Sequence, residues 1–224
     1  MKHIVWDFDG TLVDSRPLIE AGMEHALRGL GLLHREDLRE EWMRGVGLPV
    51  EEGLRRVFEP LGMDPREVLE VYRGFDWRGH EGLLQPFPGM AELIRELGER
   101  GVPMGIATSK RRIPLLRQLE SVGWAGRFSP IVTPDDVTRG KPDPESLHLI
   151  LEQTHCQAQD LVMVGDTPFD LDMAQAAGVP SLAVGHGFYD VERLLPCHPR
   201  AYAPDVEALR DILLAWFPCT EIAT

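Results

Sequence analysis

The sequence has few cysteines and no long apolar run. Its 224 residues contain 3 cysteines, Cys156, Cys197 and Cys219, which are widely spaced and form no Cys-x-x-Cys pair. An odd number of scattered thiols is unlike a disulfide framework or a zinc site, so we expect free thiols. No apolar stretch reaches the roughly 18 residues of a membrane-spanning helix, which predicts a soluble globular protein.

Positive charge is also scarce. The chain has 23 Lys and Arg against 36 Asp and Glu, which gives a formal net charge of -13. Binding along a nucleic acid or an anionic membrane needs a basic surface, so we expect no nucleic-acid and no membrane partner. We expect the opening MKHIVWDFDG not to act as a secretory signal, because Asp7 interrupts its apolar stretch. The predicted location is therefore cytoplasmic, and the sequence does not distinguish a monomer from a dimer.

Apolar spacing divides the chain into two predicted domains. Residues 15–85 carry a helical apolar period, and the segment QPFPGM at their end (85–90) has the prolines and glycine of a linker. Residues 1–14 and 86–224 instead alternate short apolar strands with helices. This alternation predicts an α/β core domain, a Rossmann-like doubly wound parallel sheet covered on both faces, with residues 15–85 as an inserted α-helical domain.

The same spacing predicts the individual elements. In the insert, a first helix is expected after Ser15 as N-cap, and further helices over 36–43, 50–58 and 65–72. In the core, strands are expected near 4–8, 103–107, 130–133, 161–164 and 181–184. Core helices are expected over 90–100, 110–122, 144–154, 169–177 and 206–216.

Four polar segments lie where they can share one crevice. In an open parallel sheet, ligands bind beyond the carboxyl ends of the strands, near the point where strand order reverses. The first, second and fourth segments follow apolar strands, and the third opens a helix. The segments are DFDGT (7–11), ATS (107–109), GKPDP (140–144) and GDTPFD (165–170).

The acidic residues of these segments need a cation if they meet. Two unit charges about 4 Å apart repel by about 4 kcal/mol at a dielectric constant of about 20. Oxygen ligands select a hard cation, and Mg²⁺ suits such a cluster better than zinc does. Lys141 adds a point charge suited to phosphate, and Thr108 with Ser109 offers a hydroxyl and backbone N–H groups at an expected helix N-terminus. Together they predict a phosphoryl pocket.

In this order the four segments resemble the haloacid dehalogenase superfamily of phosphohydrolases. The opening DFDGTLVDS (7–15) is especially similar to the phosphoglycolate phosphatase-like branch, and the resemblance covers nearly the whole chain. In that family a helical cap interrupts the chain just after the first motif, which is where residues 15–85 lie. The resemblance implies a Mg²⁺-dependent phosphatase acting on a small phosphorylated metabolite, with phosphoglycolate as one candidate.

The resemblance also implies roles for the acidic residues. Asp7 would attack phosphorus and form an aspartyl-phosphate, while Asp9 would protonate the leaving oxygen and later activate water. Asp7, Asp166 and the backbone carbonyl of Asp9 would hold the Mg²⁺ ion. Asp170 would orient a phosphate-binding lysine or a metal-bound water. The implied phosphate-binding residues are Thr108, Ser109 and Lys141.

In the insert, the family places a substrate-facing loop between two helices. The corresponding residues here are Arg44, Gly45 and Gly47. An ordinary interhelical turn explains them equally well.

Each core residue also has a structural explanation. Thr108 is an ordinary helix N-cap residue, Lys141 beside a proline is typical of a solvated turn, and Asp166 with Asp170 favours a helix N-terminus. Only their combination favours a site. The basic run 110–112 is interpreted as a solvated helix start rather than as part of the site.

Several other functions are weighed against hydrolysis. A phosphomutase acting on a sugar phosphate shares the fold, but the insert shows no clear acid/base dyad for it. A dehalogenase does without the second acid that Asp9 provides, and phosphonate cleavage needs a cap lysine, which is absent between Ser15 and Gln85. A phospho-accepting signalling receiver is much shorter. A non-catalytic relative is disfavoured because no catalytic position is missing.

Overall fold

The computed structural model describes residues 1–218, and Cys219 lies outside that range. One of two lobes is built on a six-stranded sheet of order β5-β4-β1-β6-β7-β8, in which all neighbouring strands are parallel. Strand order reverses at β1, because the chain adds β4 and β5 on one side of β1 and then crosses over to add β6, β7 and β8 on its other side. The strands are β1 (His3–Trp6), β4 (Met104–Ala107), β5 (Ile131–Val132), β6 (Leu161–Gly165), β7 (Ser181–Val184) and β8 (Ala201–Ala203).

The central strands are apolar on both faces. Every residue of β1 and β6 is buried, as expected for parallel strands with helices on each side. Ile4 and Trp6 pack on one face with Val164, whereas Val5 packs on the other face with Met163. A short continuous apolar run is therefore the sequence signal of a strand in this core.

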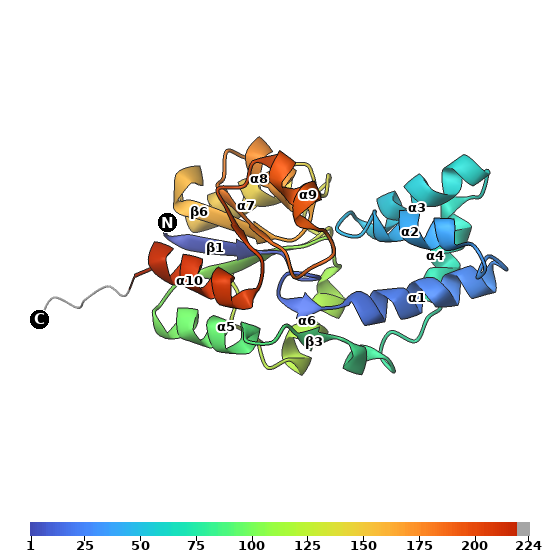
Figure 1. The fold of residues 1–224 in the computed structure, drawn as a ribbon, viewed down its shortest axis with the longest axis horizontal. Coiled ribbons are helices and arrows are strands. Elements are labelled where there is room, and N and C mark those ends of the chain that lie inside the picture. Colours follow the sequence, from blue (N-terminus) through green and yellow to red (C-terminus); the bar gives the residue numbers. More distant parts are fainter. Residues whose placement is uncertain (219–224) are drawn as a thin grey trace, which may run out of the picture.

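Helices cover both faces of the sheet (Figure 1). Helices α5 (Met90–Glu99), α6 (Arg112–Ser121) and α10 (Val206–Trp216) pack on the first face. Helices α7 (Glu145–Thr154) and α8 (Pro168–Ala176) pack on the second, with the short α9 (Val191–Leu194) beside α8. The predicted α/β class, with a doubly wound parallel sheet, is confirmed.

Four helices form a second body, which we call the helical lobe. Figure 1 shows it beside the carboxyl ends of the central strands. Its helices enclose a separate apolar core that includes Trp42, Leu54 and Phe58. The helices are α1 (Arg16–Gly29), α2 (Glu36–Met43), α3 (Val50–Phe58) and α4 (Pro65–Arg73).

The chain passes between the lobes at a small antiparallel ribbon. It consists of β2 (Val13–Asp14) and β3 (Gln85–Pro86). Short 3-10 helices complete the described elements: η1 (Glu59–Leu61), η2 (Glu81–Leu83), η3 (Ala158–Asp160) and η4 (Leu195–Cys197). Within residues 1–218, no helix is both long and apolar enough to cross a membrane.

Two local predictions differ from the structure, and one strand of the core sheet was not predicted. Helix α6 starts at Arg112, so Thr108 and Ser109 lie in the loop before it and not at a helix N-terminus. Ser15 precedes α1 as predicted, but its side chain makes no capping hydrogen bond. Strand β8 was not predicted, because two of its three residues are alanine, which is depleted in strands.

Candidate active site

The site lies at the carboxyl ends of three neighbouring strands. Asp7 follows β1, Thr108 follows β4 and Asp166 follows β6, and β1 pairs with both other strands. Because strand order reverses at β1, this is the crevice position that an open parallel sheet provides. The loop before α7 brings Lys141 to the same place.

Lys141 bridges two buried carboxylates. Its Nζ donates a hydrogen bond to Asp7 Oδ1 at 2.6 Å and forms an ion pair with Asp170 Oδ1, also at 2.6 Å. Lys141 is only 4% exposed, so the alternative of a solvated turn lysine is wrong. Burial alone would lower the pKa of Lys141, but the charges of Asp170 and Asp7 outweigh it and raise that pKa.

Asp170 is held on its other side by Thr167. The Thr167 backbone N–H and hydroxyl both donate to Asp170 Oδ2, at 3.1 and 2.7 Å. The Asp170 N–H donates in return to Thr167 Oγ1 at 3.3 Å, which completes a capping box at the start of α8. The Asp170 carboxylate therefore helps to cap the start of α8 and also contacts Lys141. The structural explanation, a helix N-terminus, and the expected contact with the phosphate-binding lysine both apply.

Asp166 is fixed by donors and by close backbone. The Thr11 hydroxyl donates to its Oδ1 and the Phe188 N–H to its Oδ2, each at 2.8 Å. A Cβ atom at Gly10 or Gly187 would collide with the Asp166 carboxylate, and Gly10 also has a φ of +81° that favours glycine. These hydrogen bonds and close backbone contacts thus fix the position of the Asp166 carboxylate.

The buried charges at this site do not balance. One carboxylate oxygen each of Asp7, Asp166 and Asp170 lie within 4.8 Å of one another, and Lys141 is the one basic side chain of residues 1–218 paired with them. Burial, reinforced by the neighbouring aspartates, raises the pKa of Asp7 to about 7 even against the Lys141 charge. The same causes raise the pKa of Asp166 well above its usual range. Such a surplus of buried oxygen charge fits a hard divalent cation.

The metal-free protein is expected to lose stability as pH rises. A carboxyl group whose pKa is raised by folding binds its proton more tightly in the folded state, so its contribution is lost as pH rises through the folded pKa. For Asp7 this loss runs from the ordinary value of 3.8 up to about 7. We expect the Tm of EDTA-treated protein to be several degrees higher at about pH 5 than at about pH 8.

The control for this pH effect is the Asp166→Asn variant. It should make Tm depend less on pH, because it removes one of the buried carboxylate charges. Added Mg²⁺ should raise Tm more at the higher pH, because protons and metal compete for the same oxygens. A Tm that increases with pH in EDTA would contradict the charge surplus.

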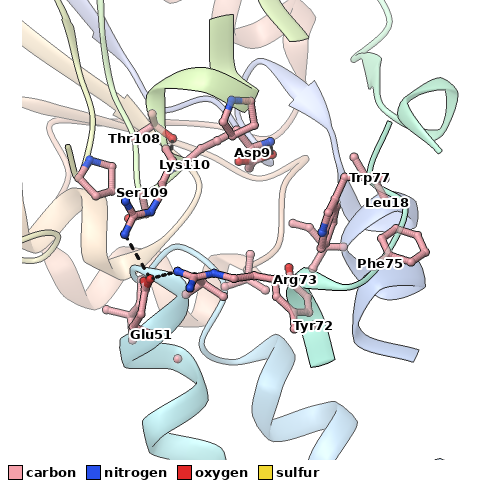
Figure 2. Close-up of a pocket in the computed structure, with 18 of the residues that line it drawn as sticks. Asp9, Leu18, Glu51, Tyr72, Arg73, Phe75, Trp77, Thr108, Ser109 and Lys110 are labelled. Carbon is pink, nitrogen blue, oxygen red and sulfur yellow. Dashed lines mark hydrogen bonds and ion pairs between the residues drawn. The ribbon is translucent and has the colours of Figure 1, made fainter. Parts of the chain in front are cut away.

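Asp9 faces the space between the lobes. Lys110 Nζ donates to Asp9 Oδ1 at 2.7 Å and to Gln118 Oε1 at 2.6 Å. Figure 2 shows the Lys110 and Asp9 side chains next to each other. The interpretation of 110–112 as a solvated helix start is therefore wrong for Lys110, because the helix begins only at Arg112 and Lys110 turns inward.

Ser109 joins the two lobes. Its Oγ donates to the Gly47 carbonyl at 2.7 Å, and Thr108 Oγ1 accepts a hydrogen bond from the Lys110 N–H at 3.2 Å. Both Thr108 and Ser109 line the cavity described below. The structure thus places the Thr108 hydroxyl at the site edge, while the Ser109 hydroxyl contacts the helical lobe.

The loop of residues 44–47 contacts the core through its backbone. Gly45 and Gly47 line the cavity, whereas the Arg44 guanidinium pairs on the surface with Glu40 and Glu41 at 3.4 and 3.2 Å. The Arg44 carbonyl accepts a hydrogen bond from the Tyr189 hydroxyl. The Arg44 side chain is not part of the cavity wall, which corrects the expectation for this residue.

A cavity of about 590 Å³ lies between the lobes (Figure 2). Small-molecule sites have volumes of about 300 to 1,000 Å³. The core residues on its wall include Asp7, Asp9, Thr108, Ser109 and Lys110. The rest of the wall comes largely from apolar residues of the helical lobe and of the segment after α4.

Several residues of the site were missed by sequence reasoning. Thr11, which holds Asp166, belongs to the DFDGT motif, so its motif position could have indicated it. Gln118 and Gly187 had no such signal, because tertiary packing alone brings them to the site. Gly187 is also contacted by Arg16, whose Nη2 donates to the Gly187 carbonyl at 3.4 Å.

Comparison with known proteins agrees with this geometry. The family profile of haloacid dehalogenase-like hydrolases matches residues 4–184. A pyrophosphatase PpaX from Oceanobacillus iheyensis is 29% identical over 95% of this chain and 97% of its own length. A phosphoglycolate phosphatase from Yersinia pseudotuberculosis is 32% identical over 89% of this chain and 87% of its own. The solved structure of a haloacid dehalogenase-like family hydrolase from Streptococcus pneumoniae has a TM-score of 0.79 at 24% identity, covering 97% of this chain and 98% of that one.

The sheet, the carboxylates at its edge and these matches define an enzyme of the hydrolase class. More particularly, the chain belongs to the haloacid dehalogenase-like hydrolase family, as the resemblance of its four segments predicted. Its relatives in that family include named phosphatases. The predicted enzyme class, a phosphoric monoester hydrolase, is thereby confirmed.

Proposed function

We propose that this chain is a Mg²⁺-dependent phosphatase that hydrolyses a small phosphomonoester through an aspartyl-phosphate on Asp7. The observation that carries this proposal is the placement of Asp7. Its carboxylate is buried against Lys141, belongs to a cluster of three aspartates, and still lines the cavity. A nucleophile needs all three conditions: a fixed position, compensating charge and access to substrate.

The metal proposal follows from the charge surplus at the cluster. Asp7, Asp166 and the backbone carbonyl of Asp9 would hold Mg²⁺, which when bound neutralises negative charge on the phosphoryl group. The donor set supports this assignment, because it consists of oxygens alone and includes no thiol or imidazole.

The remaining roles are assigned to residues around the nucleophile. Lys141 is held between Asp7 and Asp170, which supports a role for its ammonium in binding the phosphoryl oxygens as Asp7 attacks. The Thr108 hydroxyl lies at the end of the adjacent strand and binds the same group. Because phosphoryl transfer passes through a loose, charge-rich transition state, this positioning supplies most of the rate.

Asp9 is proposed as the acid and base. It protonates the leaving oxygen when Asp7 attacks, and later takes a proton from the water that cleaves the aspartyl-phosphate. Its hydrogen bond to Lys110 holds the carboxylate at the cavity wall, outside the cluster of Asp7, Asp166 and Asp170. Two acidic groups in different environments can therefore perform different steps.

The test of this proposal is a stoichiometric assay over a panel of phosphate esters that includes phosphoglycolate, a hexose phosphate, a nucleotide and pyrophosphate. We expect inorganic phosphate to appear in equal amount to the substrate lost, with activity removed by EDTA and restored by Mg²⁺. Isomerisation of the hexose phosphate without phosphate release would indicate a phosphomutase. A stable phosphoprotein after acetyl phosphate treatment, with no turnover of any ester, would indicate a receiver.

A further inference from the structure

The far wall of the cavity is aromatic. Four rings that line it contact one another in series, with centroid separations of 5.5 Å for Trp42–Tyr72, 4.9 Å for Tyr72–Trp77 and 4.8 Å for Phe75–Trp77. The last two pairs meet edge to face, an arrangement that fixes ring orientation. The wall is therefore preformed in the structure.

Trp77 is held especially closely. A Cβ atom at Gly22 of α1 would collide with its ring, so the indole lies directly against the helix backbone. Leu18 and Ile19, one turn earlier on α1, continue the wall. Figure 2 shows Leu18, Phe75 and Trp77 together on the side of the cavity away from Thr108 and Ser109.

The basic residues of the cavity are already paired with protein groups. Arg73 and Arg111 both contact Glu51, at 3.0 and 3.5 Å, and Arg117 pairs with Glu81. Lys110 contacts Asp9. Among the basic residues that line the cavity, only the exposed Arg78 has no acidic partner within residues 1–218. Most of the positive charge at the end of the cavity beyond the phosphoryl site is thus held in ion pairs with carboxylates of the protein.

We propose that the preferred substrate is a phosphomonoester whose alcohol carries a flat aromatic or heteroaromatic ring. The inference rests on the proposed function and adds the substrate class. The ring lies against Tyr72 and Trp77 while the phosphoryl group meets Asp7. Wholly polar anions such as pyrophosphate and phosphoglycolate would leave this apolar wall exposed to water. A ring that packs against the wall removes its apolar surface from water, which favours binding.

The reaction balances with the residues present. An Asp7 oxygen bonds to phosphorus as the ester P–O bond breaks, and the departing alcohol takes a proton from Asp9. Water then attacks phosphorus and gives its proton to Asp9, the aspartyl P–O bond breaks, and inorganic phosphate leaves. The ring takes no part in bond making, so its effect is confined to binding and orientation.

The test compares benzyl, cyclohexylmethyl and propyl phosphate, whose leaving alcohols have similar acidity. We expect kcat/KM for benzyl phosphate to exceed that for propyl phosphate by about tenfold or more, with the saturated ring between them. Benzyl phosphate should also exceed phosphoglycolate and pyrophosphate. Equal values for the three esters, or a preference for either small anion, would overturn the inference while leaving the phosphatase proposal intact.

Two variants separate substrate contact from folding. Trp77→Leu and Tyr72→Leu should each lower kcat/KM for benzyl phosphate about tenfold and leave propyl phosphate within about twofold. Trp216→Leu, which removes a partly buried tryptophan on α10 outside the cavity, is the matched control and should change neither. Equal losses on both esters in the two cavity variants would make the wall purely structural. Absence of hydrolysis of every ester would instead refute the proposed function, and the inference with it.

Discussion

Replacing Asp7 with asparagine is expected to lower kcat by at least about 10⁴-fold, because the amide cannot attack phosphorus. The change keeps the size of the side chain and an oxygen that can accept from Lys141 Nζ. It also removes a charge that burial makes costly, so the metal-free variant should be at least as stable as the wild type. The measurements are kcat with p-nitrophenyl phosphate and Tm in EDTA.

The matched control for Asp7→Asn is Asp143→Asn. Asp143 lies in the same GKPDP segment as Lys141, but its carboxylate contacts the Arg139 guanidinium at 3.2 Å and the Glu145 N–H at 3.0 Å. This control should keep nearly full activity. Retained turnover in Asp7→Asn would contradict the covalent mechanism. A large fall in the Tm of Asp7→Asn would mean that the carboxylate stabilises the fold.

The Asp9→Asn variant is expected to separate the two chemical steps. p-Nitrophenolate leaves without protonation, so Asp7 can still be phosphorylated, but the aspartyl-phosphate then lacks its base. We expect a burst of p-nitrophenol close to one equivalent per active site, followed by turnover about 10² to 10⁴ times slower than in the wild type. Stopped-flow absorbance measures both phases.

Benzyl phosphate supplies the comparison for Asp9→Asn, since its alkoxide needs a proton to leave and no burst should appear. Asp76→Asn is the control variant, because Asp76 also lines the cavity but comes from the segment after α4. It should show wild-type kinetics. Unchanged steady-state turnover in Asp9→Asn would contradict the proposed acid and base role.

The fold could be predicted because its signals are local. Short apolar runs such as Ile4 to Trp6 are buried on both faces, and polar segments follow them at fixed chain positions. The rule for open parallel sheets then places Asp7 and Asp166 together although they are far apart in sequence. That these residues lie near Lys141 could therefore be predicted without knowledge of any side-chain contact.

The rest of the site depends on contacts between the lobes. Lys110 was predicted at a solvated helix start, but the helix begins later and its ammonium meets Asp9. Trp42, Tyr72 and Trp77 belong to helical or linking segments whose apolar spacing indicates only a buried face. That these rings also line the cavity follows from how the helical lobe lies against the core, which no local pattern encodes.

The aspartyl-phosphate on Asp7 is tested most directly by acid-quenching the wild-type enzyme during turnover of p-nitrophenyl phosphate labelled with radioactive phosphorus, followed by peptide mapping. The proposed mechanism predicts hydroxylamine-labile label on the peptide that contains Asp7, and none in Asp7→Asn. Labelled phosphate released at the normal rate with no labelled peptide, or label on a different residue, would contradict it.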